Sequence, residues 1–280
     1  MEDLAGALTV DALRSAWERV RKTDTTRGGV ALDSLVRAVR EGWYRPLPCF
    51  ERSRRKPDGG VRALRIPRAP DRVLQLAVHR VASTHLDPSF RPEVHGFRPG
   101  RSPATALEHL LAQLDADREL LQVDLASMFD TLDHGRLRMA IGRAWDDPTW
   151  RCLNDAWMAA WPASPRRGVP QGAPLSPLLA NLYLHVHLDP HVASLGHPWV
   201  RYADDLTLAV PPGGAVHALR ALDGLVRRAG LGLARSKTRI AIGGTALAAA
   251  RVLGRTVRVG SVAKGVEGSA EPWWATLSRR

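Results

Sequence analysis

Residues 199–210 read WVRYADDLTLAV and contain two adjacent acids, Asp204 and Asp205. Apolar, strand-forming runs flank this pair on both sides, and such runs around a short polar turn predict a β-hairpin with two acids at its tip. Neighbouring residues of a strand face opposite sides, and burying two unpaired charges is expensive. We therefore expect the two carboxylates to bind cations.

A third acid lies at the end of another predicted strand. Residues 119–125, ELLQVDL, are strand-like and carry Asp124 near their end. Three carboxylates at strand ends would form an oxygen-rich site suited to two Mg²⁺ ions, for which Mn²⁺ can substitute. Such an ion pair supports phosphoryl transfer, since one ion activates the attacking hydroxyl and the other neutralises the leaving group. For each residue alone, a polar turn at 204–205 and a helix cap at Asp124 stay open as alternatives.

Helical and extended patterns alternate along the rest of the chain. Helical spacing covers residues 4–20, 32–39, 71–85, 176–192 and 216–229 and begins again at residue 134, a basic hairpin covers 51–67, and strands are predicted near 238–242 and 252–259. This mixed order predicts an α+β fold with an antiparallel sheet backed by helices.

The composition indicates a nucleic-acid partner. Lys and Arg number 40 against 28 Asp and Glu, a formal net charge of +12, although an arginine-biased genome would give the same excess. The two cysteines, Cys49 and Cys152, are too few for a disulfide framework or a cysteine-rich zinc site. No apolar run approaches the ~18 residues of a membrane span, and the acidic N-terminal stretch is unlike a signal peptide. We expect a cytoplasmic protein with no membrane attachment.

Several sequence blocks together resemble bacterial reverse transcriptases, the RNA-directed DNA polymerases, especially those of group II introns. The blocks are residues 62–67 (RALRIP) with 71–75 (DRVLQ), 95–102 (HGFRPGRS), 122–134 (QVDLASMFDTLDH), 168–181 (GVPQGAPLSPLLAN) and 202–205 (YADD). Their order and spacing match the family from about residue 15 to 255, while the hallmark blocks of retron enzymes are not evident. The resemblance implies a right-hand polymerase with fingers and a ferredoxin-like (RRM-like) palm that carries all three aspartates.

The resemblance also implies domain limits. Residues 1–105 would form N-terminal helices and fingers, 106–255 the palm with a fingers insertion near 135–165, and 256–280 a truncated thumb or C-terminal tail. Residues 252–255 match the primer-grip block only in part, so the thumb is expected to be short or missing. A structured RNA, a protein partner or self-assembly would then have to hold the duplex.

The metal ligands implied by the resemblance are Asp124, Asp204 and Asp205, with the Leu125 carbonyl as a further oxygen. Phe129 would be an aromatic gate that collides with a 2′-hydroxyl and so selects deoxynucleotides. A core phenylalanine is the alternative for Phe129.

The implied substrate contacts come from both halves of the chain. Gln171 and Gly172 would lie against the incoming nucleotide together with Tyr202, because glycine lets backbone approach closely. The basic residues expected to grip the triphosphate are Lys56, Arg62 and Arg98. Each of these cations could instead be simply solvated.

Lys237 is the implied general acid. The chain uses arginine freely but contains few lysines, namely Lys22, Lys56, Lys237 and Lys264. Lys237 matches the family lysine proposed to protonate the leaving pyrophosphate, and an ammonium can release a proton during turnover whereas a guanidinium effectively cannot.

The activity implied is extension of a DNA or RNA primer with dNTPs on an RNA template, in a mobile element, in antiviral defence or in another operon. Three alternatives stay open: an RNA-templated RNA polymerase, template-independent or protein-primed DNA synthesis, and a non-catalytic RNA-binding scaffold.

Overall fold

The computed structural model describes residues 3–23, 29–55, 59–114, 118–161, 166–241, 251–252 and 255–256. The chain forms two compact units. Unit 1 is built from the described parts of Met1–Leu86 and Leu132–Leu182, and unit 2 from those of Asp87–Thr131 and Tyr183–Ala270. The boundaries predicted at residues 105 and 255, between fingers, palm and thumb, stay a prediction.

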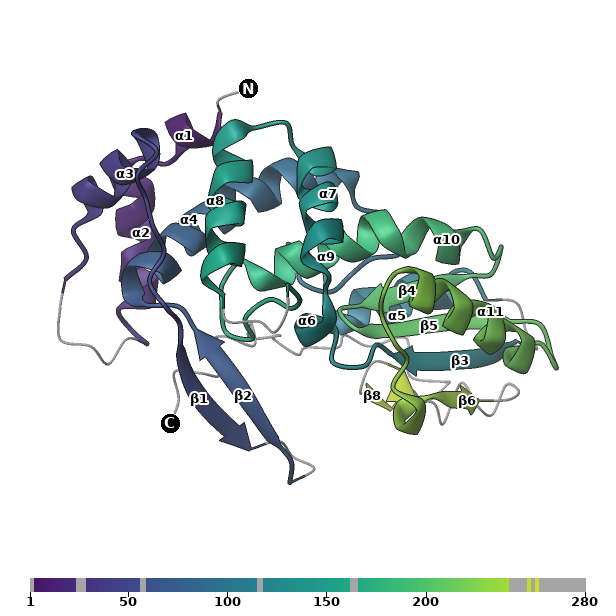
Figure 1. Ribbon diagram of the computed structural model, residues 1–280. Helices are drawn as coiled ribbons and strands as arrows, with labels where there is room; N and C mark the ends of the chain where they lie inside the picture. The colour runs from purple at the N-terminus through teal and green to yellow at the C-terminus, as the bar shows by residue number, and fades with distance from the viewer. Residues whose placement is uncertain are drawn as a thin grey trace. The chain divides into compact units, whose positions relative to one another are not determined.

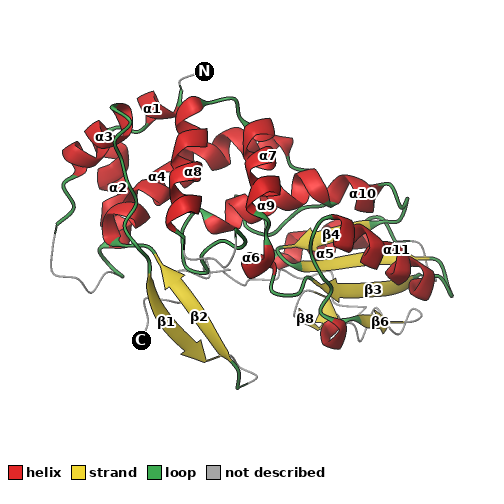
Figure 2. Cartoon of the chain, viewed as in Figure 1, coloured by secondary structure: helices red, strands yellow, loops and turns green. Residues whose placement is uncertain are grey.

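Unit 1 is mainly helical (Figure 1; Figure 2). Its helices are α1 (Leu4–Ala7), α2 (Val10–Val20), α3 (Leu32–Arg40), α4 (Ala69–Leu86), α7 (His134–Ala144) and α8 (Pro148–Ala160), and α9 (Ser176–His187) begins in it. The continuous helical stretch predicted over residues 4–20 is wrong at Leu8, because the chain starts a second helix there. Thr9 caps this second helix by accepting a hydrogen bond from the Ala12 N–H at 3.2 Å.

Buried polar contacts join the helices of unit 1. Asp147 caps α8 by accepting a hydrogen bond from the Trp150 N–H at 2.7 Å, and its other oxygen accepts one from the Leu4 N–H at 2.8 Å. One carboxylate therefore satisfies the free N–H groups of two helix starts.

The basic hairpin predicted over residues 51–67 is confirmed. Strands β1 (Phe50–Arg55) and β2 (Val61–Ile66) pair antiparallel, with Arg54 opposite Arg62. Every residue of β1 is exposed. Strand β1 thus offers its basic side chains to solvent on both faces.

Unit 2 contains an antiparallel sheet of four described strands in the order β4-β5-β3-β6. The strands are β3 (Glu119–Asp124), β4 (Trp199–Tyr202), β5 (Asp205–Val210) and β6 (Arg239–Ala241). Helices lie between β3 and β4 in the chain, and α11 (Ala215–Arg228) lies between β5 and β6. This βαββαβ succession with β3 and β5 in the centre is the ferredoxin-like arrangement that the family resemblance implied.

Further elements of unit 2 are short, apart from α5. They are η1 (Asp87–Ser89), α5 (Pro103–Leu111), α6 (Met128–Thr131), α10 (Asp189–Ala193), η2 (Arg235–Lys237), β7 (Arg251–Val252) and β8 (Arg255–Thr256). The helix predicted over residues 176–192 is divided at Leu188. Pro190 in the first turn of α10 explains the division, since proline lacks the N–H needed to continue a helix.

The two faces of the sheet have different covers. Leu110 of α5 packs with Leu120, Val200 and Ala209, which share one face. Arg201, next to Val200 on β4, projects on the opposite face and binds Asp189 of α10. The sheet is therefore covered by α5 on one face and supported by α10 on the other.

Candidate active site

The sheet of unit 2 brings the three predicted aspartates together at one end. Asp124, the last residue of β3, lies directly opposite Asp205, the first residue of β5. Opposite residues of an antiparallel pair project on the same face, so their carboxylates are neighbours. Asp204 precedes Asp205, and its carbonyl accepts a hydrogen bond from the Leu125 N–H at 3.0 Å.

The turn between β4 and β5 requires an unusual backbone. Ala203 has φ +58°, in the left-handed region that residues with a Cβ disfavour. Gly96 lies against this turn, and a Cβ added to it would come 2.1 Å from the Ala203 nitrogen. Only glycine fits at position 96. Residues 93–96 therefore pack closely against the turn at residues 203–204, which we call the aspartate turn.

Residues 232–234 run beside the end of β3 and carry Lys237 to the site. The Ala126 N–H donates to the Gly232 carbonyl, and the Ala234 N–H donates to the Asp124 carbonyl, both at 2.8 Å. The next residues form η2, and Lys237 Nζ donates to Asp124 Oδ2 at 2.8 Å. The predicted general acid and a predicted metal ligand are thus in direct contact.

Negative charge exceeds positive charge at this end of the sheet, where three carboxylates lie near the ammonium of Lys237. Burial first, and then the charges of Asp204 and Asp124, raise the pKa of Asp205 to about 6, whereas Lys237 acts to lower it. The hydrogen bond to Asp124 is the main cause that raises the pKa of Lys237. A cation bound here would relieve the repulsion among the three carboxylates.

The three aspartates carry ligand atoms of the kind that divalent metal ions bind. Carboxylate oxygens are hard ligands of the kind Mg²⁺ prefers, and a bound cation would offset both causes of the raised pKa of Asp205, namely its burial and the charges of Asp204 and Asp124. Across the described ranges, no three His, Cys, Asp or Glu side chains are placed so that they could hold a metal ion as they stand. Asp124 instead pairs with Lys237.

The predicted gate residue is braced by a second ring. Phe129, in α6, is half-buried, and Phe97 meets it edge-on with ring centroids 6.1 Å apart. Phe97 itself has φ +61°, and Ser127, two residues before Phe129, has φ +47°. The backbone at or near each ring is therefore in the left-handed region. Tyr202, at the end of β4, is opposite Asp205 and so projects on the face of the acids.

In unit 1 the loop that carries Gln171 and Gly172 lies against strand β2 of the basic hairpin. Gly172 has φ +137°, and a Cβ added to it would lie 3.1 Å from the Arg65 carbonyl oxygen of β2. His134 supports the start of the loop by donating from Nε2 to the Gly168 carbonyl at 2.7 Å. Gln171 is half-buried beside Gly172.

Of the three predicted triphosphate ligands, only Arg98 has a side chain that the structure describes. The backbone of Arg62 belongs to β2, and its side chain and Lys56 lie outside the described residues. Arg98 is described, with a side chain only 6% exposed. Its guanidinium binds the Asp87 carboxylate and the carbonyls of Asp87, Arg91 and Val94 at 2.8–3.2 Å.

Sequence reasoning missed three residues around the aspartate turn: Gly96, Asp189 and Arg201. Arg201 donates two hydrogen bonds to Asp189, and both side chains are 0% exposed. A signal was present, since an arginine inside the apolar run WVRY of a predicted hairpin must find a buried partner.

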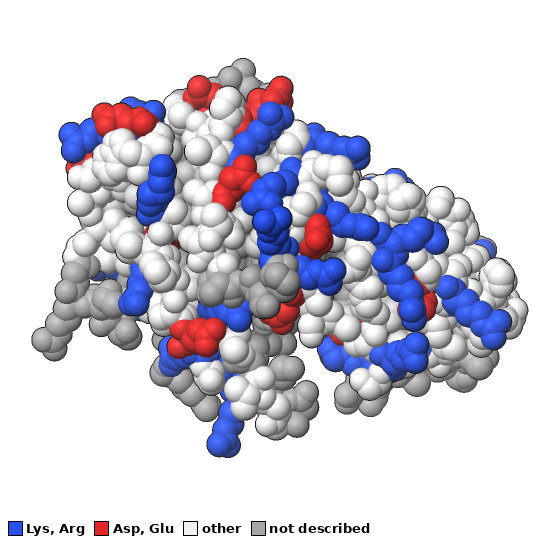
Figure 3. Space-filling view, viewed as in Figure 1, with Lys and Arg blue, Asp and Glu red and all other residues white. Residues whose placement is uncertain are grey.

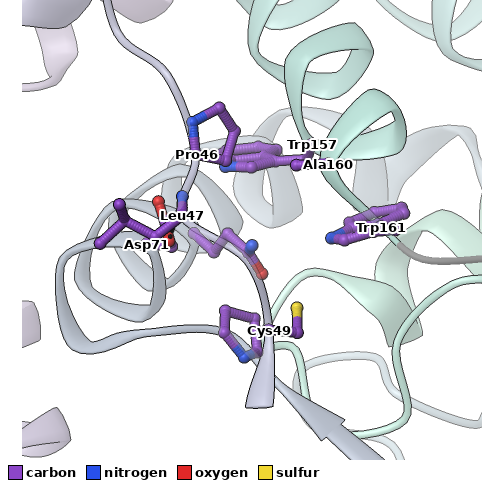
Figure 4. A pocket seen from close by; sticks show the side chains of 9 residues that line it. Pro46, Leu47, Cys49, Asp71, Trp157, Ala160 and Trp161 are labelled. Carbon is purple, nitrogen blue, oxygen red and sulfur yellow. Dashed lines mark hydrogen bonds between the residues drawn. The ribbon is translucent and has the colours of Figure 1, made fainter.

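Unit 1 also holds a narrow cavity that opens to solvent and has no room for a water molecule (Figure 4). Its walls include Pro46, Leu47, Trp157 and Trp161. Asp71, also on the wall, accepts hydrogen bonds from the Tyr44 hydroxyl and, at 3.0 Å, from the Leu47 N–H. These bonds tie the segment before the hairpin to α4, and we assign the cavity no ligand.

Lys and Arg side chains are spread widely over the face drawn in Figure 3, with fewer acidic groups among them. This distribution agrees with the formal net charge of +12 and with a polyanionic partner. Among the helices of the described residues, none is long and apolar enough to cross a membrane.

A ferredoxin-like sheet with acids at adjoining strand ends is the palm of a right-hand nucleic-acid polymerase. Residues 54–261 match the family model described as reverse transcriptase (RNA-dependent DNA polymerase), and the chain belongs to this family. The resemblance noted in the sequence is thereby confirmed. Reverse transcriptases use an RNA template and a primer, and they depend on divalent metal.

Relatives of two kinds are similar to this chain. The group II intron-encoded protein LtrA of Lactococcus lactis subsp. cremoris is 32% identical over 171 residues, which cover 59% of this chain and 28% of that protein. The retron Mx65 reverse transcriptase of Myxococcus xanthus is 33% identical over 222 residues, covering 72% of this chain and 49% of that protein. The chain thus spans less than half the length of these relatives.

A solved structure of apo telomerase from Candida tropicalis, truncated from the C-terminal domain, aligns with a TM-score of 0.51. The alignment covers 70% of this chain and 50% of that chain at 10% identity. At this identity the likeness concerns the fold alone, and it confirms the predicted polymerase fold.

Proposed function

We propose that this chain is an RNA-directed DNA polymerase that extends a primer 3′-hydroxyl with dNTPs on an RNA template. The observation that carries the proposal is the placement of Asp124 directly opposite Asp205, with Asp204 adjacent, in a chain of the reverse transcriptase family. We place the reaction in the cytoplasm, in a mobile element, in antiviral defence or in another operon.

Asp124, Asp204 and Asp205 would hold two Mg²⁺ ions, or Mn²⁺ in their place, and the Leu125 carbonyl would add an oxygen ligand. When bound, such ions lower the pKa of the primer hydroxyl and neutralise the leaving pyrophosphate. Asp205 must be ionised to act as a ligand, so its raised pKa opposes metal binding in acid.

Lys237 would protonate the leaving pyrophosphate. Its hydrogen bond to Asp124 supports this assignment, because it holds the ammonium beside the carboxylate that would carry the metal. The Lys237 side chain is largely exposed, so it would be able to turn from Asp124 toward a phosphate oxygen.

Substrate selection would fall to several groups. Phe129, braced by Phe97, would exclude the 2′-hydroxyl of a ribonucleotide, and Tyr202 would line the same face of the sheet as the acids. In unit 1, Gln171 and Gly172 would meet the nucleotide.

The basic hairpin would contribute Lys56 and Arg62 to the triphosphate. Arg98 has its guanidinium committed to Asp87 and three carbonyls, so we propose that it positions residues 87–94 and does not touch the triphosphate.

Primer extension on an RNA template with dNTPs and Mg²⁺ tests the proposal. Asp204→Asn and Asp205→Asn keep side-chain shape and should abolish extension, whereas Asp223→Asn, an acid on the outer side of α11 paired with Arg227, should not. Activity in the first two variants contradicts the metal assignment. Product made without template, or with rNTPs as readily as with dNTPs, would instead support one of the alternative polymerases.

A further inference from the structure

A buried ion pair joins α10 to β4 inside unit 2. Arg201 donates from Nε to Asp189 Oδ1 at 2.9 Å and from Nη2 to Asp189 Oδ2 at 2.7 Å, and both side chains are 0% exposed. Removing two charges from water costs free energy that only well-formed geometry offsets. A hydrophobic pair of similar volume would serve packing as well, so the ion pair indicates a positional purpose.

The guanidinium makes a third hydrogen bond, from Nη1 to the carbonyl of Ala203 at 3.1 Å. Ala203 forms the turn between β4 and β5 and immediately precedes Asp204. Its left-handed backbone, with φ +58°, is disfavoured for a residue with a Cβ and persists only where the surroundings hold it. Arg201 is one of the groups that hold it.

Arg201 acts from the face opposite to the acids. Tyr202 pairs with Asp205 across β4 and β5, whereas Arg201 pairs with Leu206. Adjacent residues of a strand project on opposite faces, so the Arg201 side chain cannot meet a substrate bound on the face of Asp205. Its effect on the reaction must pass through the turn.

The backbone of Arg201 is fixed as well. Its N–H donates to the Glu93 carbonyl at 2.9 Å, and its carbonyl accepts from the His95 N–H at 2.8 Å. Gly96, next in the chain, packs directly on the Ala203 backbone. Residues 93–96 therefore contact the turn at the edge of the sheet, and the Arg201 side chain contacts it on the face opposite to Asp205.

We infer that Asp189 and Arg201 are positioning residues that fix the Ala203 turn and, through it, Asp204 and Asp205. Asp189 orients the guanidinium, and the guanidinium fixes the carbonyl. The catalytic consequence rests on the proposed function, whereas the effect on the turn does not.

The kinetic test compares Arg201→Lys and Asp189→Asn with Leu222→Ala, a fully buried change on α11 that destabilises without touching the turn. Lysine keeps the charge but cannot form three bonds from one planar group. We expect kcat to fall at least about tenfold in the first two variants, with the KM for dNTP nearly unchanged. The double variant should lose no more than the more severe single variant, because both act through one carbonyl.

A second readout does not need polymerase activity. Hydrogen exchange of the backbone amides of residues 203–206, followed by mass spectrometry, should be faster in Arg201→Lys and Asp189→Asn than in Leu222→Ala at matched global stability. Unchanged exchange at the turn, or unchanged kcat in an active enzyme, overturns the inference. If wild-type protein shows no extension, the proposed function fails while exchange still decides the positioning. Should Arg201→Lys not fold, Asp189→Glu takes its place with the same expected results.

Discussion

Lys237 Nζ donates a hydrogen bond to Asp124 Oδ2 at 2.8 Å, although the two residues are 113 positions apart in the chain. The contact depends on residues 232–234, which pair with the end of β3 and lead directly into η2. The proposed proton donor and a proposed metal ligand therefore share one end of the sheet, and the ammonium compensates part of the negative charge there.

The first prediction concerns proton transfer by Lys237. Lys237→Arg keeps the positive charge and the partner Asp124 but removes a group that can release a proton. We expect the single-turnover rate of extension to fall roughly 10²-fold with nucleotide affinity retained. Rapid-quench measurement decides it, with Lys22→Arg on the surface as the matched control. A full rate in Lys237→Arg would show that Lys237 acts only by charge.

The second prediction concerns pH and stability. The pKa of Asp205, about 6, lies above the ordinary carboxyl value of 3.8, so the folded state binds an extra proton between these values. The stability that this proton confers is complete below pH 3.8 and is lost as the pH rises through about 6. Asp205→Asn, which carries no charge, should therefore raise the melting temperature at neutral pH and not at acid pH.

Calorimetry of the metal-free protein measures this difference. Since Asp205 is partly exposed, the gain should amount to a few degrees at most. Divalent metal should stabilise the wild type and leave Asp205→Asn nearly unaffected. If Asp205→Asn raised the melting temperature equally at all pH values, the ionisation of Asp205 would not be the cause.

The third prediction concerns sugar selection. Phe129→Ala should increase the incorporation of rNTPs relative to dNTPs, because the ring that would meet the 2′-hydroxyl is removed. Phe97→Ala should give the same change in weaker form, because Phe97 contacts the gate ring edge-on. The ratio of kcat/KM for the two nucleotides on one template is the measurement. An unchanged ratio in Phe129→Ala would return this residue to a packing role.

The fourth prediction compares two glycines. Gly96→Ala places a Cβ 2.1 Å from the Ala203 nitrogen, against backbone that cannot move aside, and should destabilise by about 1–3 kcal/mol and impair extension. Gly224→Ala, inside α11, meets only the Arg228 side chain at 3.6 Å and should stabilise by about 0.5–1 kcal/mol. Urea unfolding of both variants gives these values. Wild-type stability in Gly96→Ala would mean that the turn is not held as the structure shows.

Much of the fold could be predicted because strand and turn signals are local. The WVRY and LTLAV runs around Asp204 and Asp205 identified the β4–β5 hairpin, and ELLQVD identified β3. The helix breaks at Leu8 and Leu188 were missed, since the apolar spacing continues across both positions. In the structure Thr9 caps the start of α2, and Pro190 in the first turn of α10 lacks the N–H that would continue α9.

The site was predictable only in part for a similar reason. Acid residues beside strand ends are visible in the sequence, but the support beneath them depends on contacts between distant residues. Arg98 looked like a free cation and is saturated by Asp87 and backbone carbonyls. Arg201 lies in strand β4 as predicted, but its bonds to Asp189 on α10 and to the Ala203 carbonyl could not be predicted from the strand pattern.

The most direct test of the central claim is the binding of Mn²⁺, as a spectroscopic substitute for Mg²⁺, to protein carrying an RNA–DNA template–primer and a non-extendable dNTP. Electron paramagnetic resonance should detect protein-bound Mn²⁺ in the wild type and a marked loss of it in Asp124→Asn and in Asp205→Asn, with Asp223→Asn binding as the wild type does. Wild-type binding in Asp124→Asn and Asp205→Asn would contradict the account.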